Sequence, residues 1–114
     1  MVEMYGIPNC DTIRKARKWL AEHEIAYVFH DYKKESVDRR KLTAWIDELG
    51  WEALLNKRGT TWRKLDDADK ADVDRDKAIA LLCAHPSMIR RPILVLDGVI
   101  KVGFSVQGYN ELLR

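Results

Sequence analysis

Residues 2–31 read VEMYGIPNCDTIRKARKWLAEHEIAYVFHD, and this stretch carries the pattern of a strand, a helix and a second strand. Residues 2–7 are predicted to be a short strand that ends at Pro8, and residues 26–31, rich in β-branched and aromatic side chains, a second strand. Apolar residues at helical spacing predict an amphipathic helix that runs to about His23. Its apolar positions include Ile13, Ala16 and Leu20. This order predicts a βαβ unit with two parallel strands.

The middle of the chain is predicted to be helical. Residues 38–49 form a helix that ends at Gly50, a residue typical of helix C-termini, and residues 51–56 continue as a short helix. Residues 72–85 are predicted to be a further helix. The polar residues 57–70 that precede it are predicted to be irregular.

The C-terminal part carries the pattern of a hairpin followed by a helix. Residues 92–96 and 99–102 are predicted to be strands, because Asp97–Gly98 between them favours a tight hairpin turn. Residues 105–114 are predicted to be a closing helix. A βαβ unit followed by ββα is the thioredoxin-like arrangement. The sequence therefore predicts an α/β thioredoxin-like fold with a helical insertion, at about residues 36–88, between the two halves.

Length and composition limit the class of protein. The 114 residues fit a single domain, and 46% of them are hydrophobic, which is enough for one core. The net charge is only +2, so the bulk charge does not indicate nucleic acid as a partner. There is no signal-peptide pattern and no apolar run of the roughly 20 residues that a membrane helix needs. A cytoplasmic protein with free thiols and no membrane partner is expected.

Cys10 is the strongest candidate for a catalytic residue. It lies in the loop 9–12, which is rich in helix-capping residues, between the first predicted strand and the first predicted helix. Backbone N–H groups at a helix start lack internal partners and carry partial positive charge, so they stabilise a thiolate and lower its pKa. Arg14 and the basic residues after it also favour an anion, whereas Asp11 opposes it. The sequence thus predicts a nucleophilic thiol at Cys10, with a buried, unreactive cysteine as the alternative.

Cys83 has a different context. It lies in an apolar run of the predicted helix 72–85, which favours core packing, and a role as a resolving cysteine for Cys10 is the open alternative. A Cys-x-x-Cys pair is excluded, because Ile13 occupies the third position after Cys10. The histidines are scattered and the two cysteines are far apart in sequence, so no metal site is indicated.

Arg91 and Pro92 open the predicted C-terminal hairpin. The simple interpretation is that proline is tolerated at the first residue of a strand. The functional interpretation is that Pro92 is cis and faces the cysteine loop, while the forked guanidinium of Arg91 binds an anion at Cys10. Lys57 and Arg58, in the polar connection, form either a solvated loop or a basic lid over an anionic ligand.

Four segments together resemble one family. They are residues 5–12 (YGIPNCDT), Trp19–Leu20, residues 89–93 (IRRPI) and residues 102–104 (VGF). Over essentially its whole length the chain is similar to the arsenate reductase (ArsC)/Spx family, and most similar to its YffB-type members, described as glutathione-dependent thiol reductases. The resemblance implies that Cys10 is the catalytic cysteine and that Arg91 precedes the family's cis-proline, here Pro92. It also matches Arg14 to a basic position in the first helical turn.

The chain departs from the arsenate reductases at the positions that hold the oxyanion. Those enzymes use three arginines, and only Arg91 is a clear counterpart, because the other two positions fall on Asn56 and at or near Gly103. Each charged hydrogen bond is worth about 1.5–3 kcal/mol, so arsenate is disfavoured as a substrate. Spx proteins are redox-sensing regulators that bind the RNA polymerase α subunit. Many carry a Cys-x-x-Cys whose second cysteine falls on Ile13 here.

The sequence therefore predicts an oxidoreductase, a glutathione-dependent thiol–disulfide reductase with one nucleophilic cysteine, no metal and no tightly bound cofactor. Glutathione is the expected co-substrate, and an oxidised protein or small-molecule thiol is the second substrate. The residues expected to bind glutathione or substrate are Arg91, Pro92, Asn9, Thr12, Arg14, Lys57 and Arg58. The alternative is a Spx-like redox-linked regulator that binds a protein partner such as RNA polymerase. Arsenate reduction is a third, less favoured activity.

Overall fold

The computed structural model describes residues 1–114, and the chain folds into two compact units. The first unit comprises Met1–Glu35 and Arg91–Arg114, and the second comprises Ser36–Arg90. The insertion expected at about residues 36–88 falls inside the second unit, while the single domain expected over the whole chain stays a prediction. No helix combines the length and the hydrophobicity that crossing a bilayer requires.

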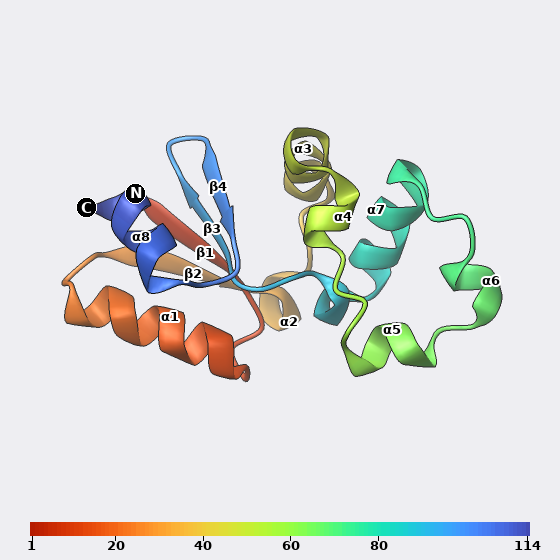
Figure 1. The fold of residues 1–114 in the computed structure, drawn as a ribbon, viewed down its shortest axis with the longest axis horizontal. Coiled ribbons are helices and arrows are strands. Elements are labelled where there is room, and N and C mark those ends of the chain that lie inside the picture. Colours follow the sequence, from red (N-terminus) through yellow and green to blue (C-terminus); the bar gives the residue numbers. More distant parts are fainter. The chain divides into compact units, whose positions relative to one another are not determined.

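The first unit is built on a four-stranded sheet with the order β2-β1-β3-β4 (Figure 1). Its strands are β1 (Val2–Gly6), β2 (Tyr27–Asp31), β3 (Ile93–Leu96) and β4 (Val99–Val102). β1 runs parallel to β2 and antiparallel to β3, and β3 and β4 form the predicted hairpin. Near the end of β1, Tyr5 is paired with His30 on one side and with Ile93 on the other. The end of β1 therefore lies beside the start of β3.

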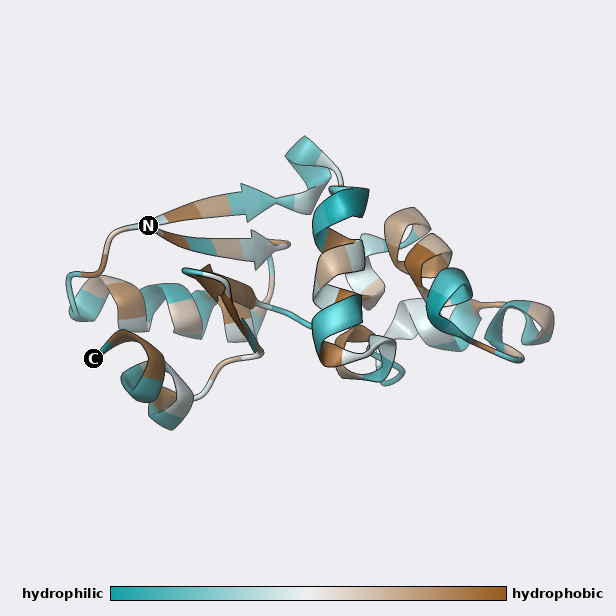
Figure 2. Cartoon of the chain, turned by 90° about the horizontal axis from the view of Figure 1, so that it is seen from above, coloured by the Kyte–Doolittle hydropathy of each residue, from teal (hydrophilic) through white to brown (hydrophobic).

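Two helices cover one face of this sheet. They are α1 (Asp11–Glu22) and α8 (Val106–Leu113), and a single turn, α2 (Tyr32–Glu35), follows β2. Hydrophilic and hydrophobic residues alternate around α1, whereas β3 is hydrophobic throughout (Figure 2). Ser105 caps α8, because its hydroxyl oxygen accepts a hydrogen bond from the Gly108 N–H at 3.0 Å. The sequence did not predict α2, since four residues are too few to show a helical period.

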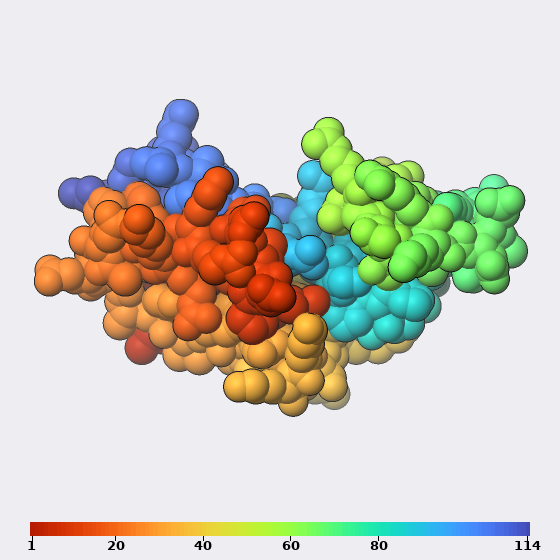
Figure 3. Space-filling view, turned by 90° about the horizontal axis from the view of Figure 1, so that it is seen from below, coloured from red at the N-terminus to blue at the C-terminus, as the bar shows by residue number.

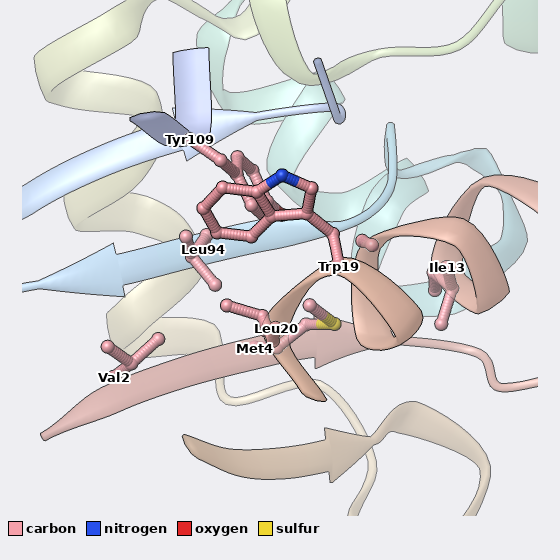
Figure 4. Packing of buried hydrophobic residues seen from close by; sticks show 8 residues of the cluster. Val2, Met4, Ile13, Trp19, Leu20, Leu94 and Tyr109 are labelled. Carbon is pink, nitrogen blue, oxygen red and sulfur yellow. The ribbon is translucent and has the colours of Figure 1, made fainter. Parts of the chain in front are cut away.

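The core of the first unit lies between the sheet and α1 and α8 (Figure 4). Its buried members are Val2, Met4, Ile13, Ala16, Trp19, Leu20, Leu94 and Tyr109. Trp19 of α1 and Tyr109 of α8 meet edge to face, with ring centroids 5.6 Å apart, an arrangement that the ring quadrupoles favour. The Tyr109 hydroxyl is buried in this core without a hydrogen-bond partner. The predicted apolar face of α1 is confirmed.

The second unit is helical. Its elements are α3 (Arg39–Leu49), α4 (Trp51–Leu54), α5 (Thr60–Lys64), α6 (Asp67–Lys70), α7 (Arg75–Ala84) and the 3₁₀ helix η1 (Pro86–Met88). Asp38 and Asp74 cap α3 and α7 with their carboxylates. Gly50 ends α3 with a φ of +88°, a value that glycine adopts without steric cost. The Arg75 guanidinium joins α7 to α3 by donating to both carboxylate oxygens of Asp47, at 2.6 and 3.1 Å.

The prediction of an irregular segment over residues 57–70 is wrong, because this segment contains α5 and α6. Each is about one turn long and has no buried residue, so neither leaves an apolar period in the sequence. A tertiary contact supports α5 instead, since the hydroxyl groups of Thr61 and Ser87 lie 2.6 Å apart. Tertiary contacts of this kind cannot be read from local sequence.

The predicted fold class is confirmed: the first unit is a thioredoxin-like α/β sheet, and the helices of the second unit are inserted between its two halves. All the predicted strands and helices are present. Several are shorter than expected, such as the helix predicted over residues 72–85, because helix and strand ends are poorly marked by local pattern.

The partnerless hydroxyl of Tyr109 generates a stability prediction. We expect Tyr109→Phe to be at least as stable as the wild type, with a gain of up to about 1 kcal/mol, because it removes a buried oxygen that has no hydrogen bond. Tyr109→Leu is the matched control, and loss of the ring contact with Trp19 should cost about 1–3 kcal/mol. Urea unfolding measures both. A loss above about 1 kcal/mol in Tyr109→Phe would show that the hydroxyl has a stabilising partner.

Candidate active site around Cys10

Cys10 lies at the junction between β1 and α1. It is the N-cap residue of α1, in an extended conformation (φ −148°, ψ 133°), and its carbonyl oxygen accepts the Arg14 N–H at 2.9 Å. The segment was predicted to be a loop through Thr12, but the helix already begins at Asp11. The thiol is half-buried, and the loop before α1 reaches the molecular surface (Figure 3). A partner can therefore approach the sulfur.

The start of α1 directs backbone N–H groups toward the sulfur. The side chain of an N-cap residue faces the N–H groups of the second and third helical residues, which are Thr12 and Ile13 here. The Cys10 side chain makes no capping hydrogen bond, but both N–H groups lower the pKa of Cys10. They belong to the N–H groups that a helix start leaves without internal partners.

Arg91 supplies the direct hydrogen bond to the sulfur. Its Nε donates to Cys10 Sγ at 3.3 Å, although the two residues are 81 positions apart in the chain. The sheet brings them together, because the end of β1 lies beside the start of β3. The Arg91–Pro92 peptide bond is cis, as the functional interpretation predicted. The Pro92 carbonyl accepts the Gly103 N–H at 2.8 Å, which ties this turn to the end of β4.

The balance of these interactions favours the thiolate. Partial burial by itself raises the pKa of Cys10. The Ile13 N–H, the Arg91 hydrogen bond, the Thr12 N–H and the positive charge of Arg91 together outweigh that effect, so the pKa is lowered from its ordinary value. More of the nucleophilic form is then present near neutral pH than in an ordinary cysteine. The predicted direction of the shift is confirmed.

The basic residues of α1 do not contribute to this shift, which corrects the expectation that they would. The Arg14 guanidinium donates to Asn9 Oδ1 at 3.1 Å and pairs with Asp11, so its charge is compensated locally. Arg17 donates to the Tyr27 hydroxyl at 2.8 Å, away from the cysteine loop. Asn9 and Arg14 thus organise the loop beside Cys10, and their contact with a substrate stays a prediction.

Lys57 and Arg58 belong to the second unit. The Lys57 ammonium lies 5.8 Å from the ring centre of Trp51 and 5.3 Å from that of Trp62, within the range of cation–π attraction. The Arg58 N–H donates to Asn56 Oδ1 at 3.0 Å. Both cations are exposed, so each is available to an anionic ligand. Their part in the Cys10 site stays a prediction.

The second cysteine is less buried than a core residue. Cys83 lies on α7 and is half-buried, and both cysteines are free thiols. Its role, whether packing or as a resolving thiol, stays a prediction. No group of three or more His, Cys, Asp or Glu side chains is arranged to hold a metal ion.

Two residues that shape the site carried no functional assignment in the sequence analysis. The sequence marks Ile13 as an apolar helix position and as the residue in place of a second cysteine, yet its N–H also lowers the pKa of Cys10. The rule that an N-cap side chain faces the third helical residue identifies it once the helix start is known. Gly6, at the end of β1, leaves open the space in which a Cβ atom would meet Ile13 and the base of Arg91. No local sequence signal reveals that proximity.

A thioredoxin-like sheet that presents a single low-pKa cysteine at the start of its first helix defines a class of thiol-redox proteins. The model of the ArsC family matches residues 5–112. The chain belongs to the ArsC family. The predicted membership of the ArsC/Spx family is confirmed.

Individual relatives agree with this assignment. An uncharacterized protein of Haemophilus influenzae is 44% identical over 110 residues, which cover 96% of both chains. The global transcriptional regulator Spx of Bacillus subtilis is 32% identical over 115 residues, which cover 99% of this chain and 87% of Spx.

Solved structures agree as well. The structure of the YFFB (PA3664) protein has a TM-score of 0.97 and 53% identity over the whole of both chains. An arsenate reductase (ArsC) related protein from Brucella melitensis has a TM-score of 0.78 and 48% identity, covering 96% of this chain and 92% of that one. Together with the geometry at Cys10, these relatives support a thiol-based redox role.

The hydrogen bond from Arg91 generates a prediction for thiol reactivity. In Arg91→Gln, loss of the charge and of the Nε donor should raise the pKa of Cys10, so alkylation at pH 6.5 should slow by about three- to tenfold. Arg14→Gln is the matched control, because Arg14 is close in sequence but does not act on the sulfur. Iodoacetamide rates measured across pH check both variants. An equal slowing in both would show that the local positive charge, and not the Arg91 contact, controls the thiol.

Proposed function

We propose that this protein is a glutathione-dependent thiol–disulfide reductase that uses Cys10 as its only catalytic cysteine. The observation that carries the proposal is the convergence of the Arg91 guanidinium and the start of α1 on one accessible sulfur. The YFFB (PA3664) and Brucella relatives support it at the level of the family.

The proposed reaction has two exchange steps. In the first, the Cys10 thiolate attacks the glutathione sulfur of a glutathionylated substrate. The substrate sulfur leaves as a thiolate that takes up a proton, and a Cys10–glutathione disulfide forms. In the second, the thiolate of a free glutathione attacks the glutathione sulfur of that mixed disulfide, and Cys10 leaves as a thiolate. One mixed disulfide and one glutathione thus become one free thiol and one glutathione disulfide, with no metal or bound cofactor.

A low pKa at Cys10 serves both steps. It increases the thiolate fraction available for the first attack, and it makes Cys10 the better leaving group in the second. Arg91 is suited to this alternation, because its guanidinium stabilises the thiolate before the first step and after the second. A second cysteine within the loop is not required, which agrees with Ile13 at the third position after Cys10.

Glutathione is an anionic tripeptide, and we propose that cations and polar groups around Cys10 bind it. Arg91 donates a hydrogen bond directly to the sulfur. Asn9, Thr12 and Arg14 offer further polar atoms near Cys10, and Pro92 belongs to the turn that carries Arg91. Lys57 and Arg58 are additional candidate cations for binding glutathione. Cation-to-carboxylate hydrogen bonds contribute about 1.5–3 kcal/mol each.

Mass spectrometry after incubation with oxidised glutathione tests the reactive thiol. We expect one glutathione adduct that maps to Cys10, no adduct in Cys10→Ser, and an undiminished adduct in Cys83→Ser. The reason is that the Cys10 thiolate is stabilised and accessible. An adduct on Cys83 alone, or none on Cys10 although the unfolded chain reacts, would contradict the proposal.

A turnover assay tests the complete reaction. With a glutathionylated peptide as substrate and glutathione as reductant, release of free peptide should be catalytic in the wild type and at background in Cys10→Ser. Arg91→Lys should retain the charge but lose the planar fork, and its kcat/KM should fall by about tenfold. Unchanged turnover in Cys10→Ser would end the proposal.

A Spx-like regulator is the second candidate, because Spx of Bacillus subtilis aligns with 99% of this chain. In that function Cys10 would act as a redox sensor, and the partner would be a protein such as the RNA polymerase α subunit. Co-purification of the α subunit in a 1:1 ratio, retained in Cys10→Ser, would favour this function over the reductase.

Arsenate reduction is less favoured for a structural reason. Gly103 has a φ of +78°, a conformation that an arginine at this position would adopt only with strain. The amide of Asn56 is already used locally, since its oxygen accepts the Arg58 N–H. Neither position supplies the forked cation that an oxyanion needs.

A further inference from the structure

Gly6 is the last residue of β1 and is buried below the cysteine loop. Its backbone lies outside the left-handed region, so its φ and ψ do not by themselves require glycine. The requirement comes from the space around it. A Cβ atom built on Gly6 would meet three neighbouring atoms, which lie on Ile13 and Arg91.

One of the three neighbours is decisive. The Cδ1 atom of Ile13 would overlap with the added carbon. The other two, Ile13 Cγ1 at 3.5 Å and Arg91 Cβ at 3.7 Å, are at ordinary van der Waals distances. Ile13 is fully buried, so its side chain has little room to turn away. A single methyl group of Ile13 therefore occupies the space that a side chain at residue 6 would need.

Ile13 and Arg91 are also the two residues that act most directly on the sulfur. Ile13 is the third residue of α1 and lies at the end of the core cluster toward which β1 runs (Figure 4). Arg91 Nε donates to Cys10 Sγ. A carbon atom added at Gly6 would therefore meet the side chain of one of these residues and the base of the other.

We propose that Gly6 is a positioning residue of the Cys10 site. Because residue 6 has no side chain, Ile13 can pack the first turn of α1 against β1, next to Arg91. The proposal builds on the proposed function, since it concerns the same thiol. An added methyl group would push Ile13, and the turn that carries its N–H, away from β1. The sulfur would then lose part of the stabilisation that this N–H gives it.

Four variants test this assignment in a Cys83→Ser background, where Cys10 is the only thiol. They are the parent, Gly6→Ala, Ile13→Val and the double variant Gly6→Ala/Ile13→Val. Valine lacks the Cδ1 atom, so the double variant removes the one overlapping contact and keeps the added methyl group. The measurement is the pH profile of iodoacetamide alkylation of Cys10, with circular dichroism to confirm the fold.

We expect the midpoint of the profile to move to higher pH in Gly6→Ala, and the rate at pH 6.5 to fall by about two- to fivefold. In the double variant both should return to the values of Ile13→Val. If Gly6→Ala does not fold, the comparison is made between Ile13→Val and the double variant. Equal alkylation midpoints in these two variants support the proposal. A loss of stability that leaves the midpoint unchanged in Gly6→Ala overturns it, as does a double variant with a higher midpoint than Ile13→Val.

The outcomes also separate this proposal from the proposed function. In one outcome, the parent shows a low midpoint that rises in Gly6→Ala while Cys10 forms no glutathione adduct. That result would support the positioning role and contradict the proposed reductase function. An ordinary midpoint in the parent would overturn both, because there would then be no stabilised thiolate to position.

Discussion

The site depends on N–H groups that the start of α1 leaves without partners. A helix provides such groups only at its first turn, so the side chain of the N-cap residue is the one best placed to use them. Cys10 meets this condition because β1 ends at Gly6 and only residues 7–10 separate it from α1, which begins at Asp11. The sheet then delivers Arg91 to the same sulfur, since β3 begins beside the end of β1. The N–H groups act on this thiol because Cys10, and not a neighbouring residue, is the N-cap.

Partial burial of the sulfur balances two opposing demands. Burial alone disfavours the thiolate, and it also strengthens the hydrogen bonds and the charge interaction that favour it, because less water screens them. Full exposure would weaken those interactions, whereas full burial would exclude a disulfide partner. Cys10 lies between these limits, with Arg91 on one side and the helix start on the other. Such an arrangement is suited to a thiol that must alternate between nucleophile and leaving group.

Ile13 occupies the third position after Cys10, where a Cys-x-x-Cys loop would hold its second cysteine. Its side chain is fully buried in the core of the first unit, and its N–H acts on the Cys10 sulfur. The position thus serves packing and electrostatics together. The loop itself holds no partner thiol, so in the proposed reaction an external thiol completes the cycle. Glutathione is the co-substrate that we propose for this step.

The sequence alone determined the order of elements, the α/β class and the importance of Cys10. Those features follow from local patterns: the apolar period of α1, the Asp97–Gly98 turn, and a cysteine between a strand and a helix. Only the tertiary structure decided which cations act on the sulfur. Arg14 is near Cys10 in sequence yet pairs with Asp11, whereas Arg91 reaches the sulfur across 81 positions. Strand pairing sets that proximity, and strand pairing is a long-range property that no local pattern encodes.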